Sequence, residues 1–600
     1  MNVNFLDLFE NDFLAIFPEI FLLNAIFILL FFGLFYSGQI STMPTESSSN
    51  PLEGIVKSDL PFDEGSSLEK PASPLLTSSD SGEAVILKNI GWLSLWGLFL
   101  TLFLLYNNPI VQSIIFYNSL ILDNFTYFFK FFLILSSFSA ILLSLNYFKQ
   151  EKLNSFEFLI LLLFSTLSML LMISSYDFIS FYLTIEFQSL CFYVLAASKR
   201  NSEFSTEAGL KYFILGAFSS GLLLFGFSII YGFTGMTNFG DLSLLFTGLG
   251  DKVFDSAGAA QLSPIISNEN YGIGFDSVDS ILATGNFSLN GILLGMLFVA
   301  IGFLFKLTAA PFHMWAPDVY EGSPTAITAF FSITPKIAIL AVFTRLFLCS
   351  FYDLIFPFQK ILLFCSAASM IVGALAALSQ HKIKRLLAYS SIGHIGYILL
   401  GLSCATAEGV EGFIVYLIVY VVMTINIFAI LLSLEEVGVV RVGSGSTSWY
   451  GFGFAHSVTN SEIPAVPASN RIKYISDLAM LGKSNPILAF TLTCTLFSMA
   501  GIPPLAGFCS KFYIFFSALN ASLYFFAFLG VVTSVISCFY YIRLIKIMYF
   551  EKPSRWILYK AVSPEIAIIL GITLFFILFF FFYPSPIFYI ARKIALSLSF

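Results

Sequence analysis

The chain has 600 residues, of which 29 are Lys or Arg and 36 are Asp or Glu, so only 11% of it is charged, against roughly 25% in an average soluble protein. Hydrophobic residues make up 58% of the sequence and its mean hydropathy is +0.88, which exceeds what globular cores need. These values exclude an ordinary soluble protein and predict an integral membrane protein. The net charge of −7 also argues against a nucleic-acid partner, which requires a concentrated basic surface.

The 7 cysteines are dispersed and never form a C-x-x-C pair, so the sequence predicts no metal site, iron–sulfur cluster or disulfide framework. The first twenty residues contain four acidic residues and no Lys or Arg, so neither a signal peptide nor a transit peptide is predicted there. Together with the 73 Phe residues, which suggest an AT-rich genome, this favours synthesis inside an organelle or a bacterium.

Apolar windows of about 20 residues, the length that crosses a hydrocarbon core, recur fourteen times along the chain. Since the backbone in lipid has to satisfy its own hydrogen bonds, we expect an all-α integral membrane fold with about fourteen transmembrane helices. The expected spans are 18–37, 86–106, 122–148, 154–172, 175–197, 207–232, 290–315, 323–349, 358–379, 386–404, 411–434, 485–518, 523–549 and 565–590.

The distribution of cations in the loops predicts the orientation of these spans. With this span count, 18 Lys and Arg residues fall in loops on one side, and only Lys252, Arg592 and Lys593 fall on the other. An even number of spans places both termini on the cation-poor side. The Ser-, Pro- and Gly-rich segments 38–85 and 435–475 are predicted to be flexible and to lie on the cation-rich side.

Eight cations remain inside the expected spans, where an ionisable residue is expensive and by default suggests a functional site. Lys88, Arg345 and Lys360 lie close to span ends, where a long side chain can reach the interface. For Lys130 and Lys211, an interfacial position and a functional role are both open. The full set is Lys88, Lys130, Lys211, Lys306, Lys336, Arg345, Lys360 and Lys511.

Lys336 and Glu186 are the most central charges, because Lys336 lies thirteen residues from each end of 323–349 and Glu186 eleven residues from each end of 175–197. A Lys at this depth costs about 2.5–3.5 kcal/mol, so it should face a polar interior or an anion. One interpretation is a buried ion pair between Glu186 and a Lys that only locks helices together. The interpretation we favour is a proton-carrying site.

Two spans contain breaks beside a lysine. Lys306 precedes LTAAPFHMWAPD, and Lys511 follows AGIPPLAG, and the prolines in both segments interrupt a helix. Backbone freed at membrane depth requires a cavity or water. The breaks fall in spans seven and twelve, which cross in opposite directions, as in transporters built from inverted repeats.

We therefore expect four parts of the chain. The expected parts are the N-terminal helices in 1–153, a first repeat of five spans in 154–349, a second, inverted repeat in 350–549 and a last span in 550–600. Two of the four histidines, His313 and His394, lie beside spans, where a hydrogen-bonded structural role is the more common one. No constellation suited to nucleophilic catalysis or hydrolysis is present.

Four segments carry a resemblance to a known family: 184–221 (TIEFQSLCFYV and onward), 305–340 (FKLTAAPFHMWAPD and onward), 384–397 (KRLLAYSSIGHIGY) and 499–516 (MAGIPPLAGFCSKFYIFF). They resemble the subunit 2 family of mitochondrial NADH:ubiquinone oxidoreductase, respiratory complex I. The resemblance implies an antiporter-like, mitochondrially encoded subunit of the inner membrane, with the cation-rich side in the matrix. Both termini would then lie in the intermembrane space.

The resemblance also implies the site. The family's glutamate falls on Glu186, and its lysines fall on Lys211, Lys306, Lys336 and Lys511. Glu186 and Lys306 would be a switchable pair near the entry, Lys336 the central relay, and Lys511 the exchange site with the far side or with the neighbouring subunit. No cofactor is expected in this chain, since NADH, FMN, iron–sulfur clusters and ubiquinone would belong to partner subunits.

The expected partners are other membrane-arm subunits, including antiporter-like neighbours, and lipids such as cardiolipin. Three alternatives remain open at this point. The chain could be a subunit of a multisubunit cation/proton antiporter, which shares the broken-helix plan. It could be the plastid relative of the same complex, or a membrane scaffold whose lysines are silent.

Overall fold

Helix α13 (Thr325–Arg345) forms the core of the structure, because every one of its residues is buried. It packs against α4 and α5 on one side and against α16 on another. The computed structural model describes residues 12–42, 78–108, 112–151, 155–246, 286–434, 436–440, 472–552, 556–559 and 561–598. Much of the segments predicted to be flexible, 43–77 and 441–471, lies outside these described residues.

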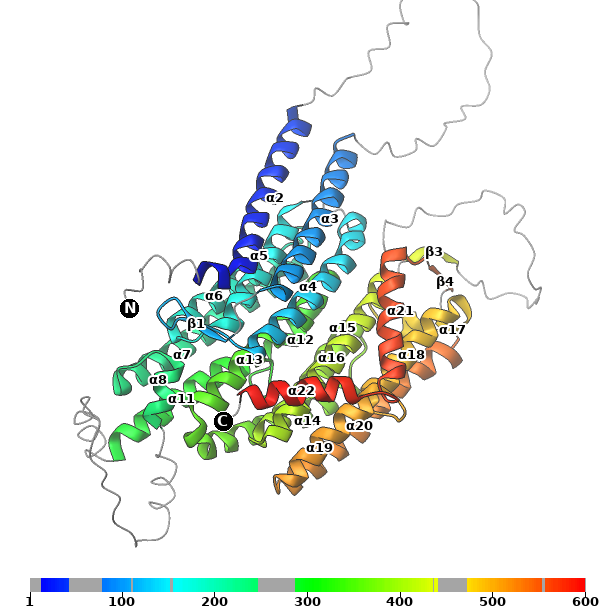
Figure 1. Ribbon diagram of the computed structural model, residues 1–600. Helices are drawn as coiled ribbons and strands as arrows, with labels where there is room; N and C mark the ends of the chain where they lie inside the picture. Colours follow the sequence, from blue (N-terminus) through cyan, green and yellow to red (C-terminus); the bar gives the residue numbers. More distant parts are fainter. Residues whose placement is uncertain are drawn as a thin grey trace, which may run out of the picture.

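The described residues are almost entirely helical (Figure 1). The N-terminal helices are α2 (Phe17–Thr42), α3 (Ser78–Tyr106) and α4 (Asn124–Gln150). The helices that precede α13 are α5 (Glu157–Ser174), α6 (Phe178–Ala196), α7 (Glu203–Thr234), α8 (Phe239–Phe246), α11 (Asn286–Lys306) and α12 (Trp315–Gly322). A π-helical turn, Leu346–Ser350, and a 3-10 turn, Tyr352–Leu354, follow α13.

The second half of the chain repeats this helical character. Its helices are α14 (Ile355–Leu378), α15 (Ile383–Ser403), α16 (Ala407–Ser433), α17 (Leu481–Ser484), α18 (Pro486–Ala500), α19 (Ala506–Asn520), α20 (Tyr524–Phe550), α21 (Pro564–Phe579) and α22 (Ser585–Leu598), with a 3-10 turn at Ile475–Leu478. Two small antiparallel pairs complete the structure. They are β1 (Ser113–Ile115) with β2 (Leu120–Leu122), and β3 (Glu436–Val440) with β4 (Trp556–Tyr559).

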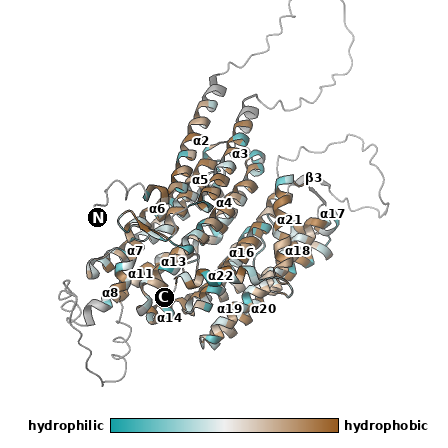
Figure 2. Cartoon of the chain, viewed as in Figure 1, coloured by the Kyte–Doolittle hydropathy of each residue, from teal (hydrophilic) through white to brown (hydrophobic). Residues whose placement is uncertain are grey.

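Among the described residues, 11 helices are long and apolar enough to cross a membrane, and the three shorter apolar helices are Asn290–Lys306, Pro486–Ala500 and Pro564–Phe579. Burial divides the long helices into central and outer ones. In α15 and α16 the most apolar window is 89% and 83% buried, whereas in α2 and α20 it is 28% and 33% buried. Figure 2 shows hydrophobic residues along the outer helices as well, so these helices present apolar side chains to lipid.

The last predicted span, 565–590, is wrong in its second half. Helix α21 ends at Phe579, and the chain turns before α22 begins at Ser585. Figure 1 shows α22 lying across the other helices, over α16. Pro584 and Pro586 in the sequence explain the turn, because a proline fits the first turn of a helix and not its interior.

Two cations are buried in ion pairs. They are Arg345, which we expected to reach the interface from a span end, and Lys130, whose position the sequence left open. Arg345 does not reach an interface, since it is 3% exposed and its Nη2 lies 3.0 Å from the Asp123 carboxylate at the start of α4. Lys130 on α4 is 2% exposed, and its Nζ lies 2.6 Å from the Glu19 carboxylate on α2. Lys88 and Lys360 are exposed, as expected.

The Glu19–Lys130 pair yields the first prediction. Glu19→Gln would leave the Lys130 ammonium buried without an anion, which costs about 3–5 kcal/mol. The amount of folded chain in the membrane and its thermal stability should therefore fall. Adding Lys130→Met should restore both, because it removes the unpaired charge.

The matched control is Glu551→Gln, because Glu551 pairs at 3.7 Å with Lys546 and both side chains are largely exposed. That change should leave the stability within the range of a surface substitution. If Glu19→Gln behaved like the control, the Glu19–Lys130 pair would not hold α2 to α4.

Candidate functional site

Both predicted breaks are present, and they end their helices in the same way. Helix α11 ends at Lys306 and α12 begins at Trp315, while α18 ends at Ala500 and α19 begins at Ala506. Each break contains a residue with positive φ, Thr308 at 65° and Gly501 at 88°. In each, the next amide donates to a carbonyl five residues back, Ala309 N to Leu304 O and Ile502 N to Phe497 O.

This hydrogen-bond pattern is a C-terminal helix cap, which requires one residue with a left-handed backbone conformation. A proline follows the left-handed residue after three positions in both segments, at Pro311 and Pro504. The two breaks therefore share a local structure as well as a composition.

Lys306 lies at the last residue of α11, and its Nζ is buried with no hydrogen-bond partner among the described residues. Glu186 on α6 interacts with it electrostatically. In the described part of the chain, however, no ion pair within 4 Å joins them. One carboxylate oxygen of Glu186 accepts from Ser189 Oγ at 3.2 Å, and the other is buried without a partner. The two groups are thus close enough to influence each other without forming a bridge.

Lys306 and Lys336 line one cavity, here called the first cavity. Its lining includes Gln188, Ser189, Lys306, Trp315, Tyr320 and Lys336. The neighbours of Glu186 on α6 line this cavity, whereas the Glu186 carboxylate does not. The structure therefore brings Lys306 and Lys336 together and places Glu186 beside them.

Lys336 is 2% exposed, and its Nζ donates to the Tyr420 hydroxyl at 2.8 Å. The same Nζ lies 5.0 Å from the centre of the Tyr420 ring. Tyr420 belongs to α16, the neighbour of α13. The most central cation of the chain is therefore held by a phenol on the facing helix.

Two further cavities continue from Tyr420 towards Lys511. The second cavity is lined by residues that include Tyr320, Ser332, Ser390, His394, Tyr420 and Met499. The third cavity is lined by residues that include Ser390, His394, Tyr397, Met499, Lys511 and Tyr541. Tyr320 is shared by the first and second cavities, and His394 is shared by the second and third.

His394 is 3% exposed and has a partner on each ring nitrogen: Nδ1 lies 2.7 Å from the Tyr416 hydroxyl and Nε2 lies 3.3 Å from the Tyr541 hydroxyl. The sequence favoured a structural histidine at this position. The hydrogen bonds agree with that expectation, but His394 also lines both the second and the third cavity. The residues Lys306, Lys336, His394 and Lys511, which line the three cavities, are here called the row.

Lys511 on α19 forms hydrogen bonds with backbone carbonyls at the second break. It is 5% exposed, and its Nζ donates to the carbonyl oxygens of Met499 at 2.8 Å and Ala500 at 3.1 Å. These carbonyls belong to the last residues of α18, which have no partner within the helix. The C-terminal end of a helix also attracts cations. Because the break ends α18 at Ala500, it provides both the carbonyl oxygens and the favourable helix end for the lysine.

Lys211 lies apart from this row. Its side chain is 41% exposed and forms ion pairs with Glu207 at 2.7 Å and Asp318 at 3.1 Å. Asp318 also accepts from Arg385 at 3.3 Å, and Glu321 pairs with Lys382 and with Arg385.

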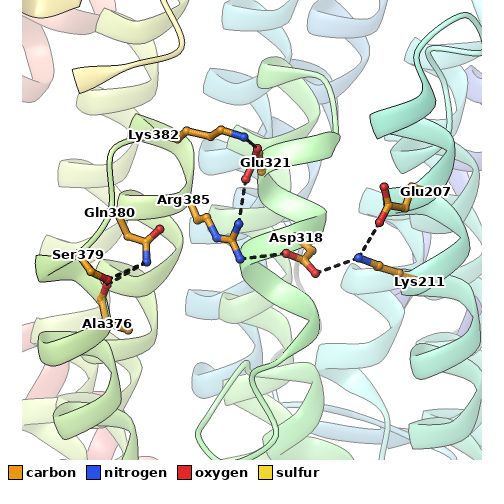
Figure 3. Close-up of polar contacts among 9 residues, drawn as sticks. All are labelled: Glu207, Lys211, Asp318, Glu321, Ala376, Ser379, Gln380, Lys382 and Arg385. Atoms are coloured by element: carbon orange, nitrogen blue, oxygen red, sulfur yellow. Dashed lines mark hydrogen bonds and ion pairs between the residues drawn. The ribbon is translucent and has the colours of Figure 1, made fainter. Parts of the chain in front are cut away.

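Figure 3 shows this charged cluster spanning α7, α12 and the start of α15. Its members are Glu207, Lys211, Asp318, Glu321, Lys382 and Arg385, and they surround an open pocket. Asp318 and Glu321 were not predicted as members of the cluster, because they pair with residues more than sixty positions away, whereas Glu207 pairs with Lys211 one turn along the same helix.

Within the described residues, no three His, Cys, Asp or Glu side chains gather in a group that could hold a metal ion. The arrangement instead provides buried amines, phenols and an imidazole, which are groups that accept and donate protons. The chemistry that this row of residues supports is proton transfer.

Comparisons with known proteins agree on one family. The family described as "NADH:quinone oxidoreductase/Mrp antiporter, TM" matches residues 175–537. NADH-ubiquinone oxidoreductase chain 2 of Marchantia polymorpha is 50% identical over 592 residues, which cover 98% of this chain and 100% of that one.

Solved structures resemble the fold. A chain of respiratory complex I from Thermus thermophilus superposes with a TM-score of 0.61 at 25% identity and covers 86% of this chain and 98% of its own. A chain of the Mrp complex from Dietzia sp. gives a TM-score of 0.64 at 18% identity and covers 86% of this chain and 93% of its own. The latter likeness concerns the fold alone.

The second break yields a prediction at Gly507. Its amide donates to Ser498 Oγ at 3.0 Å, and a Cβ at this position would collide with the Ser498 carbonyl oxygen. Gly507→Ala should therefore push α19 away from α18 and cost at least about 1–3 kcal/mol. Thermal unfolding of the membrane-inserted chain measures this loss.

Gly571→Ala on α21 is the control, since a Cβ there meets nothing within 4 Å. Alanine also favours a helix over glycine, so this variant should be at least as stable as the parent. Equal stability of the two variants would mean that α18 and α19 are not in contact at the break.

Proposed function

The chain belongs to the NADH:quinone oxidoreductase/Mrp antiporter family, as a multi-pass membrane subunit of the NADH:ubiquinone oxidoreductase enzyme, and from this premise we propose how it carries protons. Proton pumping is the general function of this family. We propose that protons pass from the matrix to the intermembrane space through Glu186, Lys306, Lys336 and Lys511, driven by electron transfer in partner subunits. The observation that carries this proposal is a set of three neighbouring cavities that share lining residues, the first lined by Lys306 and Lys336 and the third by Lys511.

The proposed route begins at the electrostatically coupled groups Glu186 and Lys306, which act as a switchable pair near the entry. Lys336 is the central relay, and His394 lies between it and Lys511. Lys511 exchanges protons with the far side or with a neighbouring subunit. Lys211, in the charged cluster, lies at the mouth of the entry, where its exposed side chain meets the aqueous phase.

The proposed architecture has fourteen crossings, made of the 11 long helices and the three shorter apolar ones. Residues 154–349 and 350–549 form two inverted repeats, flanked by 1–153 and 550–600. The matching caps at Thr308 and Gly501 support this division. The distribution of loop cations supports a matrix location for the cation-rich side, with both termini in the intermembrane space.

The proposed partners are other membrane-arm subunits, including antiporter-like neighbours, and membrane lipids such as cardiolipin. The proposal places NADH, FMN, the iron–sulfur clusters and ubiquinone in partner subunits. The chain is proposed to be mitochondrially encoded. Copurification with flavin and iron–sulfur subunits would support the assignment to complex I over a free cation/proton antiporter, and isolation from plastids would favour the plastid relative.

Lys336 provides the test of the transport role. Lys336→Ala should lower the number of protons pumped per electron, because it removes the central amine. Electron transfer from deamino-NADH to an artificial acceptor should be unchanged, since that path avoids this chain. Both rates are measured on the assembled complex in sealed vesicles.

The control is Lys546→Ala, because Lys546 is 66% exposed and lies outside the row of cavities. It should leave the protons pumped per electron unchanged. If Lys336→Ala also left this ratio unchanged, the scaffold alternative, in which the lysines are silent, would be correct.

Glu186 provides the test of the entry pair. Glu186→Gln should reduce pumping while the complex still assembles, because the amide no longer attracts the Lys306 ammonium. Glu186→Asp should retain part of the activity, since it keeps the charge and shortens the side chain by one methylene. Native gels report assembly, and vesicle acidification reports pumping.

A purely structural role of Glu186 gives the opposite pattern. Removing one member of a locked pair costs about 3–5 kcal/mol, so Glu186→Gln would then fail to assemble. Normal assembly together with normal pumping would contradict both roles.

A further inference from the structure

The hydrogen-bond partner of Lys336 is a phenol rather than a carboxylate. In the described part of the chain, Lys336 Nζ forms no ion pair within 4 Å, and the Tyr420 hydroxyl is its hydrogen-bond partner. The Tyr420 ring provides a second, weaker contact through its face. The phenol therefore takes the place that an anion occupies beside Lys130 or Lys211.

The Tyr420 hydroxyl also contacts the backbone of the same helix as Lys336. It donates to the carbonyl oxygen of Ser332 at 3.2 Å, and Ser332 lies one turn before Lys336 on α13. A hydroxyl has one donor and two acceptor positions. It can accept from an ammonium while donating to Ser332, and it can turn its hydrogen to the nitrogen when Lys336 is a neutral amine.

Tyr420 and Lys336 also line different cavities. Lys336 lines the first cavity, whereas Tyr420 lines the second. Their hydrogen bond therefore connects a residue of the first cavity with a residue of the second. The ring centre of Tyr420 lies 5.5 Å from that of His394, which also lines the second cavity.

We propose that Tyr420 is the positioning residue of the central relay: its hydroxyl holds the Lys336 ammonium in place of a carboxylate, and its reorientation couples the charge of Lys336 to the second cavity. The inference rests on the proposed function of Lys336. It adds a residue that acts through Lys336 and keeps its own proton throughout. A phenol suits this task because it stabilises the cation without adding a negative charge. A carboxylate, in contrast, would neutralise the ammonium permanently.

Tyr420→Phe tests the proposal, because it keeps the ring face and removes only the hydroxyl. In the assembled complex, the number of protons pumped per electron should fall by as much as in Lys336→Ala. The variant that combines Tyr420→Phe with Lys336→Ala should show no further loss, since both changes disable one unit. This ratio does not depend on the amount of active complex, so a merely structural defect would not change it.

Tyr147→Phe is the matched control. Tyr147 on α4 is 4% exposed, and its hydroxyl accepts from the backbone amide of Thr325 at the start of α13 at 3.0 Å. The Tyr147→Phe variant thus loses a buried hydroxyl contact to the same helix, α13, at a position away from the three cavities. Its protons pumped per electron should equal those of the parent.

Unchanged pumping in Tyr420→Phe alongside reduced pumping in Lys336→Ala would overturn this inference and leave the proposed function intact. A further loss in the combined variant would also overturn it. If Tyr420→Phe does not assemble, the combination with Lys336→Met decides. Recovered assembly would support the pairing of hydroxyl and ammonium, and failed assembly would contradict it.

Discussion

The structure depends on the cost of keeping cations in a medium where they have no water. A central Lys in a membrane helix costs about 2.5–3.5 kcal/mol, and the chain buries Lys306, Lys336 and Lys511 in its interior. It offsets this cost in different ways, with a phenol for Lys336 and helix-end carbonyls for Lys511. Neither the phenol nor the carbonyls carry a negative charge, so they do not neutralise the lysine permanently. That is the property a proton carrier requires.

By contrast, several cations outside the row have carboxylate partners. Lys130 pairs with Glu19, Arg345 with Asp123, and the cations of the charged cluster with three acids. A carboxylate at about 3 Å holds a cation strongly in a poorly solvated site. The buried pairs of Lys130 and Arg345 therefore fix helices to each other. Among the described residues, no ion pair within 4 Å involves Lys306, Lys336 or Lys511, which suits the role in proton transfer that we propose for them. The chemistry of the partner thus distinguishes the buried cations that hold helices together from the lysines that we propose to carry protons.

The sequence predicted most of the helices, both breaks and the lysines inside the expected spans because each is a local signal, but it missed the turn inside 565–590. Apolar windows predict helices, prolines predict breaks, and a charge in an apolar run is conspicuous wherever it stands. The partners were not predictable in the same way. Glu19 and Lys130 are separated by 111 positions, and Asp123 and Arg345 by 222. Tyr420 was missed because a tyrosine in an apolar helix resembles ordinary core packing, and only the facing helix reveals its contact.

The most direct test of the account is a map of the assembled complex at a resolution that shows ordered water. We expect water molecules in the three cavities, hydrogen-bonded in series between Lys306, Lys336, His394 and Lys511 during turnover. Such water would complete the path that the polar side chains outline. Cavities that stay dry in every state, with apolar side chains closed between Tyr420 and His394, would contradict it.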